Sequence, residues 1–320
     1  MFKYILKRIC LSFFTFFIII SLCFLFIKLL PITDATVFGQ DQGLIELRRQ
    51  QLGSYDPLPK QYWLFITRTL IGMDWGVGEQ IYQGRDVWET FISKLPPTML
   101  VNIYAMLFSV PIGLAFGIYA ALKKNKWQDA FISTAVMIIV SVPSYVYAFL
   151  IQYVLCYELQ WFPFLMDNGT DYFSWSMFVS LVPAILSLSF GTIASLTRYT
   201  RAELTEVLTS DFMLLARTKG LTKAQATTRH ALKNAMVPIF PSIIGGFIGI
   251  ISGSLIIESI FGIPGVGSLY ITAITGKAGN PDYNFFLLDS AFYTLIGLLS
   301  SIVIDISYGI IDPRIRMGER

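Results

Sequence analysis

The segment ARTKGLTKAQATTRHALKNAMVP, from Ala216 to Pro238, has the composition of the surface of a soluble helical protein. It contains three lysines, two arginines and the single histidine of the chain, and it has almost no long apolar run. The uncharged runs Tyr172–Thr197 and Ala235–Ile257 lie on either side of it. A basic helical segment between two apolar runs predicts a loop that joins two membrane-spanning helices.

The composition of the whole chain indicates that lipid is its main solvent. The chain has 320 residues, of which 54% are hydrophobic and 14% charged, and its mean hydropathy is +0.61. Soluble domains carry about 25% charged residues. The net charge of +3 comes from basic residues scattered between apolar runs, which argues against nucleic-acid binding. The cysteines have no partner at metal-ligand spacing, so we expect neither a disulfide framework nor a zinc site: Cys10, Cys23 and Cys156.

Six apolar runs have the length of a membrane span, which is about 20 residues. The first is longer than the core of a signal peptide, about 7–15 residues, and no small-residue cleavage site follows it, so we expect it to be retained. Proline and glycine inside several runs are tolerated in membrane helices, namely Pro111, Gly113, Gly117, Pro143 and Pro183. The predicted spans are Ile9–Ile27, Met99–Leu122, Ala130–Tyr157, Tyr172–Thr197, Ala235–Ile257 and Phe285–Ile311.

The distribution of lysine and arginine predicts that both termini are cytoplasmic. With the N-terminus inside, the cytoplasmic pieces hold 16 of the 24 basic residues, and the short outer loops 158–171 and 258–284 hold only Lys277. The basic segment then lies in a large cytoplasmic loop, residues 198–234. The segment 31–98 lies outside, and its pieces LIELRRQQL and KQYWLFITRTL are amphipathic, as in an interfacial helix, with aromatic residues Tyr62, Trp63 and Phe65.

Motifs for catalysis, cofactors or metals are not found in the sequence. The one histidine, His230, falls in the cytoplasmic loop, which excludes a metalloprotease on ligand count and a rhomboid-type site that needs an intramembrane histidine. TGKAG at 275–279 lacks the features of a phosphate loop, and FGIPGVG at 261–267 fails the dinucleotide fingerprint. The last span holds Asp289 and Asp305, about 24 Å apart on a helix. We expect both to be end-of-helix carboxylates, which gives little support to ion coupling.

The cytoplasmic loop is predicted to form two short helices. Ser210 or Asp211 caps the first, and Gly220 ends it in a left-handed or tightly packed turn. The apolar residues of this helix fall at helical spacing and form one narrow stripe: Phe212, Leu215 and Ala216.

The second helix of the loop begins with the capping-box pattern Thr222-x-x-Gln225 and runs into the fifth span. An amphipathic helix below a membrane lies on anionic lipid or fits into a groove on a partner. The break at Gly220 makes a compact elbow, which favours the partner.

The loop SDFMLLARTKGLTKAQATTRHALKNAMVP resembles the signature loop of binding-protein-dependent ABC importer permeases, in the version found in peptide importers. The wider family begins this motif with Glu-Ala-Ala, where this chain has Leu214, Leu215 and Ala216 before Gly220. The chain is similar throughout to the B-type permease of oligopeptide and dipeptide importers. One departure is GKAGNPDYNFF at 276–286, where the family has an Asp-Tyr-Pro-like turn. The pieces that carry the similarity are YILKRI, LPITDA, YDPLPKQYW, LPPTML, SVPSYVYAFLI, LQWFP, RYTRAELTEVL and ESIFGIPGVGSL.

The resemblance implies an all-α polytopic membrane protein with six transmembrane helices and the type I ABC importer permease fold. The chain would form half of a peptide channel in a bacterial inner membrane, without catalysis or cofactor of its own. Its partners would be membrane lipid, a homologous second permease, two ATP-binding subunits that hydrolyse ATP, and an extracytoplasmic peptide-binding lipoprotein. The residues implied in coupling to the ATPases are Phe212, Leu214, Leu215, Ala216, Arg217, Lys219, Gly220, Leu221, Arg229 and His230.

Four parts of the chain are expected. They are a first transmembrane helix at 1–30, an extracytoplasmic segment at 31–97, the importer transmembrane domain at 98–311 with the coupling loop 198–234, and a cytoplasmic tail at 312–320. Closure of the ATPases would push the helix at 211–220 and rock spans four and five, where proline and glycine permit bending. Other readings remain open: a permease for nickel, other metal chelates or another small solute of the same family, an ion-coupled carrier, or a lipid-binding structural membrane protein.

Overall fold

The computed structural model describes residues 2–29, 55–276 and 281–311, and the regular secondary structure in these ranges consists of helices joined by loops. The β-structure in the described residues is limited to an isolated bridge between Val77 and Asp86. The all-α expectation is therefore confirmed. The helices are α1 (Phe2–Leu29), α3 (Leu58–Leu64), η1 (Phe65–Ile71), α4 (Val87–Leu122), α5 (Trp127–Ser141), α6 (Ser144–Ile151), η2 (Gln152–Glu158), α7 (Trp175–Leu208), α8 (Asp211–Thr218), α9 (Lys223–Ala226), η3 (Thr227–Ala231), α10 (Leu232–Gly249), α11 (Leu255–Ile260), α12 (Val266–Thr275) and α13 (Tyr283–Ile311).

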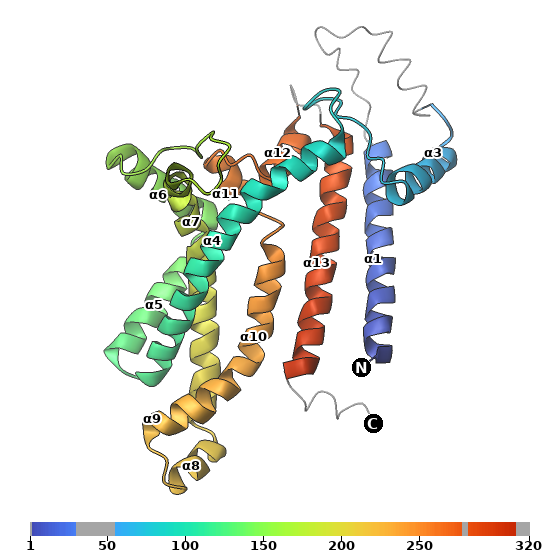
Figure 1. Ribbon diagram of the computed structural model, residues 1–320. Coiled ribbons are helices and arrows are strands. Elements are labelled where there is room, and N and C mark those ends of the chain that lie inside the picture. Colours follow the sequence, from blue (N-terminus) through green and yellow to red (C-terminus); the bar gives the residue numbers. More distant parts are fainter. Residues whose placement is uncertain (1, 30–54, 277–280, 312–320) are drawn as a thin grey trace.

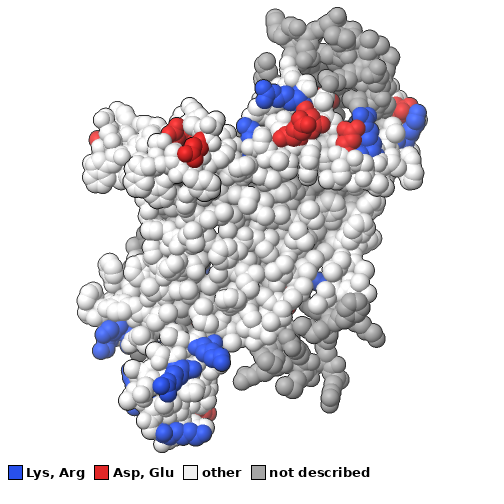
Figure 2. All heavy atoms as spheres, in the orientation of Figure 1, with Lys and Arg blue, Asp and Glu red and all other residues white. Residues whose placement is uncertain are grey.

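The long helices span the molecule from end to end. Within the described ranges, five helices are long and apolar enough to cross a membrane, and the number is six if the bent pair of α5 with α6 and η2 is counted as one span. In Figure 1 the start of α1, the end of α13 and the helices α8 and α9 lie at the same end. Figure 2 shows lysine and arginine at that end, both signs of charge at the opposite end, and an almost uncharged band between them. This is the surface expected of a polytopic membrane protein.

The third predicted span is bent, which corrects the expectation of one continuous helix from Ala130 to Tyr157. The axes of the two helical pieces meet at 99°. The break falls at Pro143, and the residue before it, Val142, is extended with φ −93° and ψ 127°. A proline disfavours helical geometry in the residue that precedes it. Pro111 and Pro183, in contrast, lie inside α4 and α7 as expected.

Two glycines bring α4 and α7 into close contact. A β-carbon at Gly117 would lie 2.5 Å from the Cβ of Thr200, and one at Gly113 would lie 3.0 Å from the Cβ of Leu196. The hydroxyl of Thr197 donates a hydrogen bond of 3.2 Å to the carbonyl oxygen of Gly113. Small residues allow membrane helices to approach and to form such bonds.

The fifth span ends earlier than predicted. The helix α10 stops at Gly249 and not at Ile257, because residues 250–253 turn and Gly253 adopts a φ of +67°. The prolines of this span, Pro238 and Pro241, lie inside α10. Of the glycines expected to permit close packing in this span, Gly245 does so, because a β-carbon there would lie 2.6 Å from the Cδ1 of Ile304 in α13, whereas no atom lies within 4 Å of a β-carbon at Gly249.

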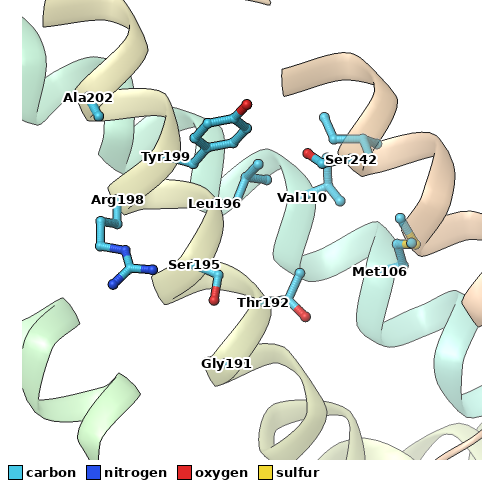
Figure 3. Close-up of a pocket in the computed structure, with 12 residues that line it drawn as sticks. Met106, Val110, Gly191, Thr192, Ser195, Leu196, Arg198, Tyr199, Ala202 and Ser242 are labelled. Atoms are coloured by element: carbon cyan, nitrogen blue, oxygen red, sulfur yellow. The ribbon is translucent and has the colours of Figure 1, made fainter. Parts of the chain in front are cut away.

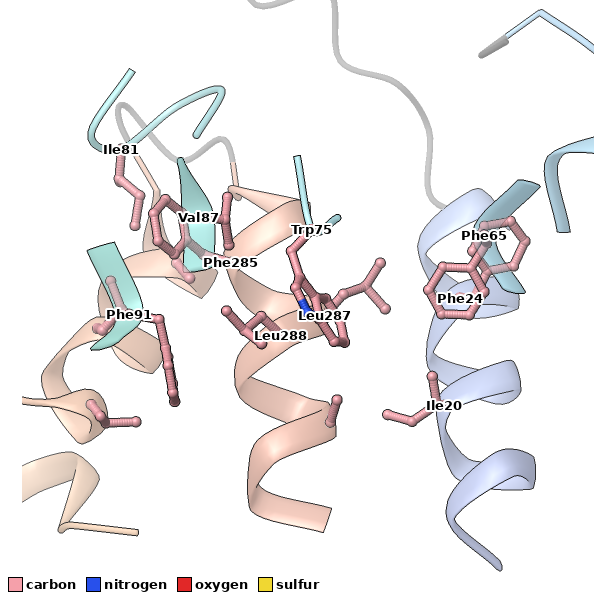
Figure 4. Close-up of a cluster of buried hydrophobic side chains, with 14 residues drawn as sticks. Ile20, Phe24, Phe65, Trp75, Ile81, Val87, Phe91, Phe285, Leu287 and Leu288 are labelled. Atoms are coloured by element: carbon pink, nitrogen blue, oxygen red, sulfur yellow. The ribbon is translucent and has the colours of Figure 1, made fainter. Parts of the chain in front are cut away.

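The segment 55–86 packs on the ends of α1, α4 and α13 that lie opposite to α8. The helix predicted within KQYWLFITRTL is present as α3 and η1, whereas LIELRRQQL lies outside the described residues. Phe65 stacks on Phe24 of α1 with ring centroids 4.7 Å apart. The hydroxyls of Tyr62 and Ser21 are 2.7 Å apart. Figure 4 shows the buried side chains that these elements share. The second membrane helix begins at Val87, before the predicted Met99.

A buried carboxylate, Asp282, connects the segment 55–86 to the start of α13 by hydrogen bonds. It accepts hydrogen bonds from the backbone amides of Glu79 and Gln80, both 2.8 Å, and of Ile81, 3.1 Å. The side chain of Asn284 donates to the carbonyl oxygen of Val77 at 2.9 Å. The stretch where the sequence departs from the family pattern therefore carries the contact between the two segments, although residues 277–280 lie outside the described ranges.

A second buried carboxylate, Glu258, organises the glycine-rich turn between α11 and α12. It is fully buried and accepts hydrogen bonds from the Thr98 hydroxyl and the Ser268 amide, both 3.0 Å. A β-carbon at Gly265 would lie 2.4 Å from its Oε2 atom. Burial raises the pKa of Glu258 to about 7. The stretch FGIPGVG therefore packs around the side chain of Glu258.

The two aspartates of the last span differ from the expectation of end-of-helix carboxylates. Asp289 is fully buried, and neither of its side-chain oxygens has a hydrogen-bond partner within the described ranges. Asp305 forms an ion pair with Arg8 of α1, with 2.6 Å between Oδ2 and Nε. Arg8 also donates to the hydroxyl of Ser301 at 2.7 Å. One aspartate therefore ties α1 to α13, and the other is a buried group without a visible partner.

Candidate coupling loop and inner groove

The elbow of the loop 198–234 forms at Gly220, as the sequence predicts. Its φ is +91°, in the left-handed region, and no atom lies within 4 Å of an added β-carbon. The turn is left-handed but not tightly packed. Because side chains other than glycine are strained in this region, glycine is required here for its backbone and not for space.

The helix caps of the loop match the prediction at the second helix only. Thr222 and Gln225 form the complete capping box at the start of α9. Ser210 is the cap position of α8, but its hydroxyl donates to the carbonyl oxygen of Val207 at 2.6 Å and makes no capping bond. Asp211 is the first residue of α8. The first backbone amides of α8 therefore have no side-chain cap.

The inward face of α8 differs from the predicted stripe. Met213 and Ala216, spaced at i and i+3, are buried and pack with Leu204 of α7 and Ala226 of α9. Met213 was missing from the prediction, and Ala216 faces the body of the protein instead of a partner. The apolar spacing of α8 fits more than one stripe, and the neighbouring helices decide which of them is covered.

The outward face of α8 carries the remaining apolar residues of the predicted site. The exposed fractions are 41% for Phe212, 63% for Leu214 and 55% for Leu215. We call these three residues the outward patch. Leu221 is partly buried against the cluster around Met213. The polar residues of the predicted site are exposed around the elbow and on η3: Arg217, Lys219, Arg229 and His230.

An ion pair that sequence reasoning missed joins α5 to α7 above this loop. Arg201 donates from Nε to Asp129 Oδ1 at 2.5 Å and from its second guanidinium nitrogen to Oδ2 at 2.8 Å. Asp129 is buried and also accepts from the backbone amide of Asn125 at 3.0 Å. Such bidentate pairs fix both distance and orientation. The turn between α4 and α5 is therefore fixed to α7 where α7 leads into α8.

A groove of about 560 Å³ opens between α4, α7 and α10. Figure 3 shows its residues, with hydroxyls of Thr192 and Ser195 on α7 and of Ser242 on α10. Arg198 carries the charge among the lining residues. The groove is otherwise lined by small and apolar side chains: Met106, Val110, Gly191, Leu196, Tyr199, Ala202, Ile243 and Gly246.

The hydroxyl-bearing residues of α7 differ in their position relative to this groove, and Ser195 lines it. Ser187 and Ser189 are buried and donate to the carbonyl oxygens of Pro183 and Ile185 within α7. The hydroxyl of Ser189 also lies 3.2 Å from the carbonyl oxygen of Ala105 in α4, so both hydroxyls already have partners in the protein. Tyr147 packs edge-on against Phe190, with ring centroids 5.7 Å apart. Only the packing of α7 against α4 and α10 shows which hydroxyls remain open.

Comparison with known proteins agrees with this architecture. Residues 113–317 match the family described as binding-protein-dependent transport system inner membrane component, and residues 1–102 match its N-terminal companion. The glutathione transport system permease protein GsiC of Escherichia coli O6:H1 is 32% identical over 319 residues, 99% of each chain. GsiC of Salmonella paratyphi A has the same identity and coverage.

A solved structure supports the fold independently. The crystal structure of an amino acid ABC transporter with histidines has a TM-score of 0.51 and 19% sequence identity, and the match covers 68% of this chain and 92% of the other. Family match, full-length relatives and fold lead to the same assignment. This chain belongs to the binding-protein-dependent transport system inner membrane component family, the multi-pass permease subunits of ABC transporters.

Proposed function

We propose that this chain forms half of the channel of an ATP-driven importer for oligopeptides or dipeptides. A second homologous permease, two cytoplasmic ATPases and an extracytoplasmic peptide-binding protein complete the importer, and ATP hydrolysis takes place on the ATPases. The observation that carries the proposal is the outward patch, Phe212, Leu214 and Leu215, on the short helix α8 at one end of the molecule. An apolar helix face of this kind fits a hydrophobic groove on a partner.

The connections of α8 explain how movement of a docked ATPase reaches the membrane spans. Met213 and Ala216 fix the inner side of α8 to α7 and α9, and α9, η3 and α10 follow one another along the chain without a gap. The ion pair between Arg201 and Asp129 extends this connection to α5. A displacement of α8 therefore acts on two of the three helices that border the inner groove, α7 and α10.

A coupling test separates docking from folding. Leu215→Asp places a charge on the outward patch, and Gly220→Val strains the left-handed turn by about 1 kcal/mol or more. Both variants are expected in the membrane at normal level, with loss of uptake and of substrate-stimulated ATPase activity in the assembled complex. Ala224→Asp is the matched control, because it adds the same charge at an exposed position near the N-terminus of α9. Normal ATPase stimulation and uptake in Leu215→Asp would disprove the docking assignment.

The proposed orientation places both termini, the loop 198–234 and the tail 312–320 in the cytoplasm, and the segment 31–97 outside, with the importer domain at 98–311. It rests on the lysine and arginine bias and on the charge at the α8 end of the molecule. Single cysteines at Lys126 and Gln225, in a chain without its native cysteines, should react with an impermeant thiol reagent only in opened cells. A cysteine at Asp171 should react in intact cells, and labelling of position 225 in sealed cells would reverse the orientation.

The peptide substrate is proposed from the relatives and from the groove. The curated relatives are named for transport of glutathione, itself a tripeptide. Hydroxyls and one arginine in the groove offer hydrogen bonds and a cation to a peptide backbone and its terminal carboxylate. Deletion should make amino-acid auxotrophs unable to grow on tri- to pentapeptides, while free amino acids still support growth. Normal peptide use in a strain without a redundant importer, combined with a nickel-uptake defect, would reassign the substrate to metal chelates.

A further inference from the structure

A second cavity lies at the α8 end of the molecule, away from the inner groove. Its volume is about 530 Å³, within the range of roughly 300–1,000 Å³ typical of small-molecule sites. It is enclosed by the end of α4 and the turn after it, the end of α7, and the helices α8 and α9 with η3. The lining residues that the following argument uses are Lys124, Lys126, Thr205, Asp211, Arg217 and Lys223.

Four basic side chains from three parts of the chain converge on this cavity. Lys124 and Lys126 come from the turn between α4 and α5, Arg217 from α8 and Lys223 from α9. None of them forms an ion pair with another residue in the described part of the chain. Asp211 is the one carboxylate in the lining, so three positive charges remain in excess. Like charges around one cavity repel each other, and a bound anion removes that repulsion.

One uncharged hydrogen-bond donor at the same cavity also lacks a partner. The hydroxyl oxygen of Thr205 is buried and has no hydrogen-bond partner in the described residues, and Thr205 lines the cavity. Buried hydroxyls in folded proteins are normally hydrogen-bonded. The start of α8 also lines the cavity at Ser210, whose hydroxyl does not cap the helix. A buried hydroxyl and an uncapped helix start, together with the cations, form a site with donors for an oxyanion.

The cavity lies at the edge of the apolar band. Trp127 and Phe131, on the first turns of α5 beside the lysines, are 74% and 69% exposed. Leu122, which lines the cavity, is 42% exposed. Exposed tryptophan next to lysine is typical of the boundary between the hydrocarbon and the headgroups. An anion bound here lies at headgroup depth, with apolar side chains beside it for an acyl chain.

We propose that this cavity binds the phosphate headgroup of an anionic phospholipid, with its acyl chains along the start of α5. The cations neutralise the phosphate, Thr205 and the start of α8 donate hydrogen bonds, and the lipid holds the turn after α4 against α8 and α9. Basic pockets at the cytoplasmic side of membrane helices have the chemistry for such headgroups. The proposal does not depend on which solute the importer carries.

Native mass spectrometry of the intact complex tests the proposal, with dioleoyl phosphatidylglycerol and dioleoyl phosphatidylcholine as the probes. The chain should retain phosphatidylglycerol in preference to phosphatidylcholine. Lys126→Gln with Lys223→Gln should weaken phosphatidylglycerol binding by roughly 30-fold, about fivefold for each lost cation, and Thr205→Val should weaken it further. Lys123→Gln with Lys233→Gln is the matched control, because it removes the same charge from residues that do not line the cavity, and it should have little effect.

Three outcomes would overturn the proposal. Equal losses in the test and control pairs would show attraction by diffuse surface charge and not a site. Inorganic phosphate that binds as tightly as phosphatidylglycerol, and equally without a membrane, would assign the cavity to a free phosphate. Normal lipid retention with loss of the ATPase subunits from Lys126→Gln/Lys223→Gln would assign it to acidic residues of the partner. Should Thr205→Val fail to fold, the lysine pair still decides, because both side chains are exposed.

Discussion

Replacing Gly117 by alanine is expected to push α4 and α7 apart and to destabilise the folded chain. A β-carbon at this position would lie 2.5 Å from the Cβ of Thr200 and 2.8 Å from the carbonyl oxygen of Thr197. Carbon atoms in contact lie about 3.5–4.0 Å apart, so the helices must separate by about 1 Å. Backbone and a β-branched side chain form the obstacle, and neither moves aside by a rotamer change.

The magnitude follows from three effects. Overpacking of this kind costs about 1–3 kcal/mol. Separation of the helices also weakens the hydrogen bond from Thr197 to the carbonyl oxygen of Gly113, 3.2 Å long, which contributes about 1 kcal/mol. The higher helix propensity of alanine offsets about 1 kcal/mol. The net loss in the free energy of unfolding is therefore about 1–3 kcal/mol.

Unfolding of the purified chain in mixed micelles, titrated with a denaturing detergent, measures this loss. Gly297→Ala is the matched control, because Gly297 lies inside α13 and no atom lies within 4 Å of an added β-carbon. The control should leave the midpoint unchanged or raise it. Equal midpoints for the two variants, or wild-type stability of Gly117→Ala, would refute the close packing of α4 on α7.

Three further predictions concern buried charges. Glu258, whose pKa is raised from its ordinary value of 4.5 to about 7, stabilises the fold fully below pH 4.5, and this contribution of up to about 3 kcal/mol is lost as the pH rises through 7. Glu258→Gln should therefore reduce the dependence of the melting temperature on pH between pH 5 and 8. A pH dependence as steep as that of the wild type would contradict this. Asp289→Leu preserves the shape of the side chain and removes a buried carboxyl that has no partner in the described residues. It should therefore raise the free energy of unfolding by about 1–3 kcal/mol. A lower free energy of unfolding in this variant would mean that Asp289 has a partner. Asp129→Asn should cost about 1–3 kcal/mol by leaving Arg201 unpaired, and addition of Arg201→Gln should restore part of it; strict additivity in this cycle would show that the ion pair contributes nothing.

Features that depend on composition, or on residues a few positions apart, could be predicted from the amino-acid sequence. The number of apolar runs predicted the spans, since any helix in lipid must satisfy its own backbone hydrogen bonds. The capping box of Thr222 and Gln225 and the left-handed turn at Gly220 were also predicted correctly, because both depend on residues within one helical turn. The family resemblance rested on the same local stretches and proved correct.

Contacts between side chains that are distant in sequence depend on how the helices pack, and the sequence did not predict them. The predicted stripe on α8 placed Ala216 outward, and the packing of α8 on α7 and α9 turned it inward with Met213. Arg201 reaches Asp129 across 72 residues, and Asp282 binds the backbone of a segment about 200 residues earlier. The spacing of apolar residues shows that a helix is amphipathic, but it does not show which neighbouring element covers the apolar face. A buried charge requires partners, and these partners are distant in sequence here. For these reasons the coupling loop was predictable as an element, while its inward face, its ion pair and the cavity beside it emerged from the fold.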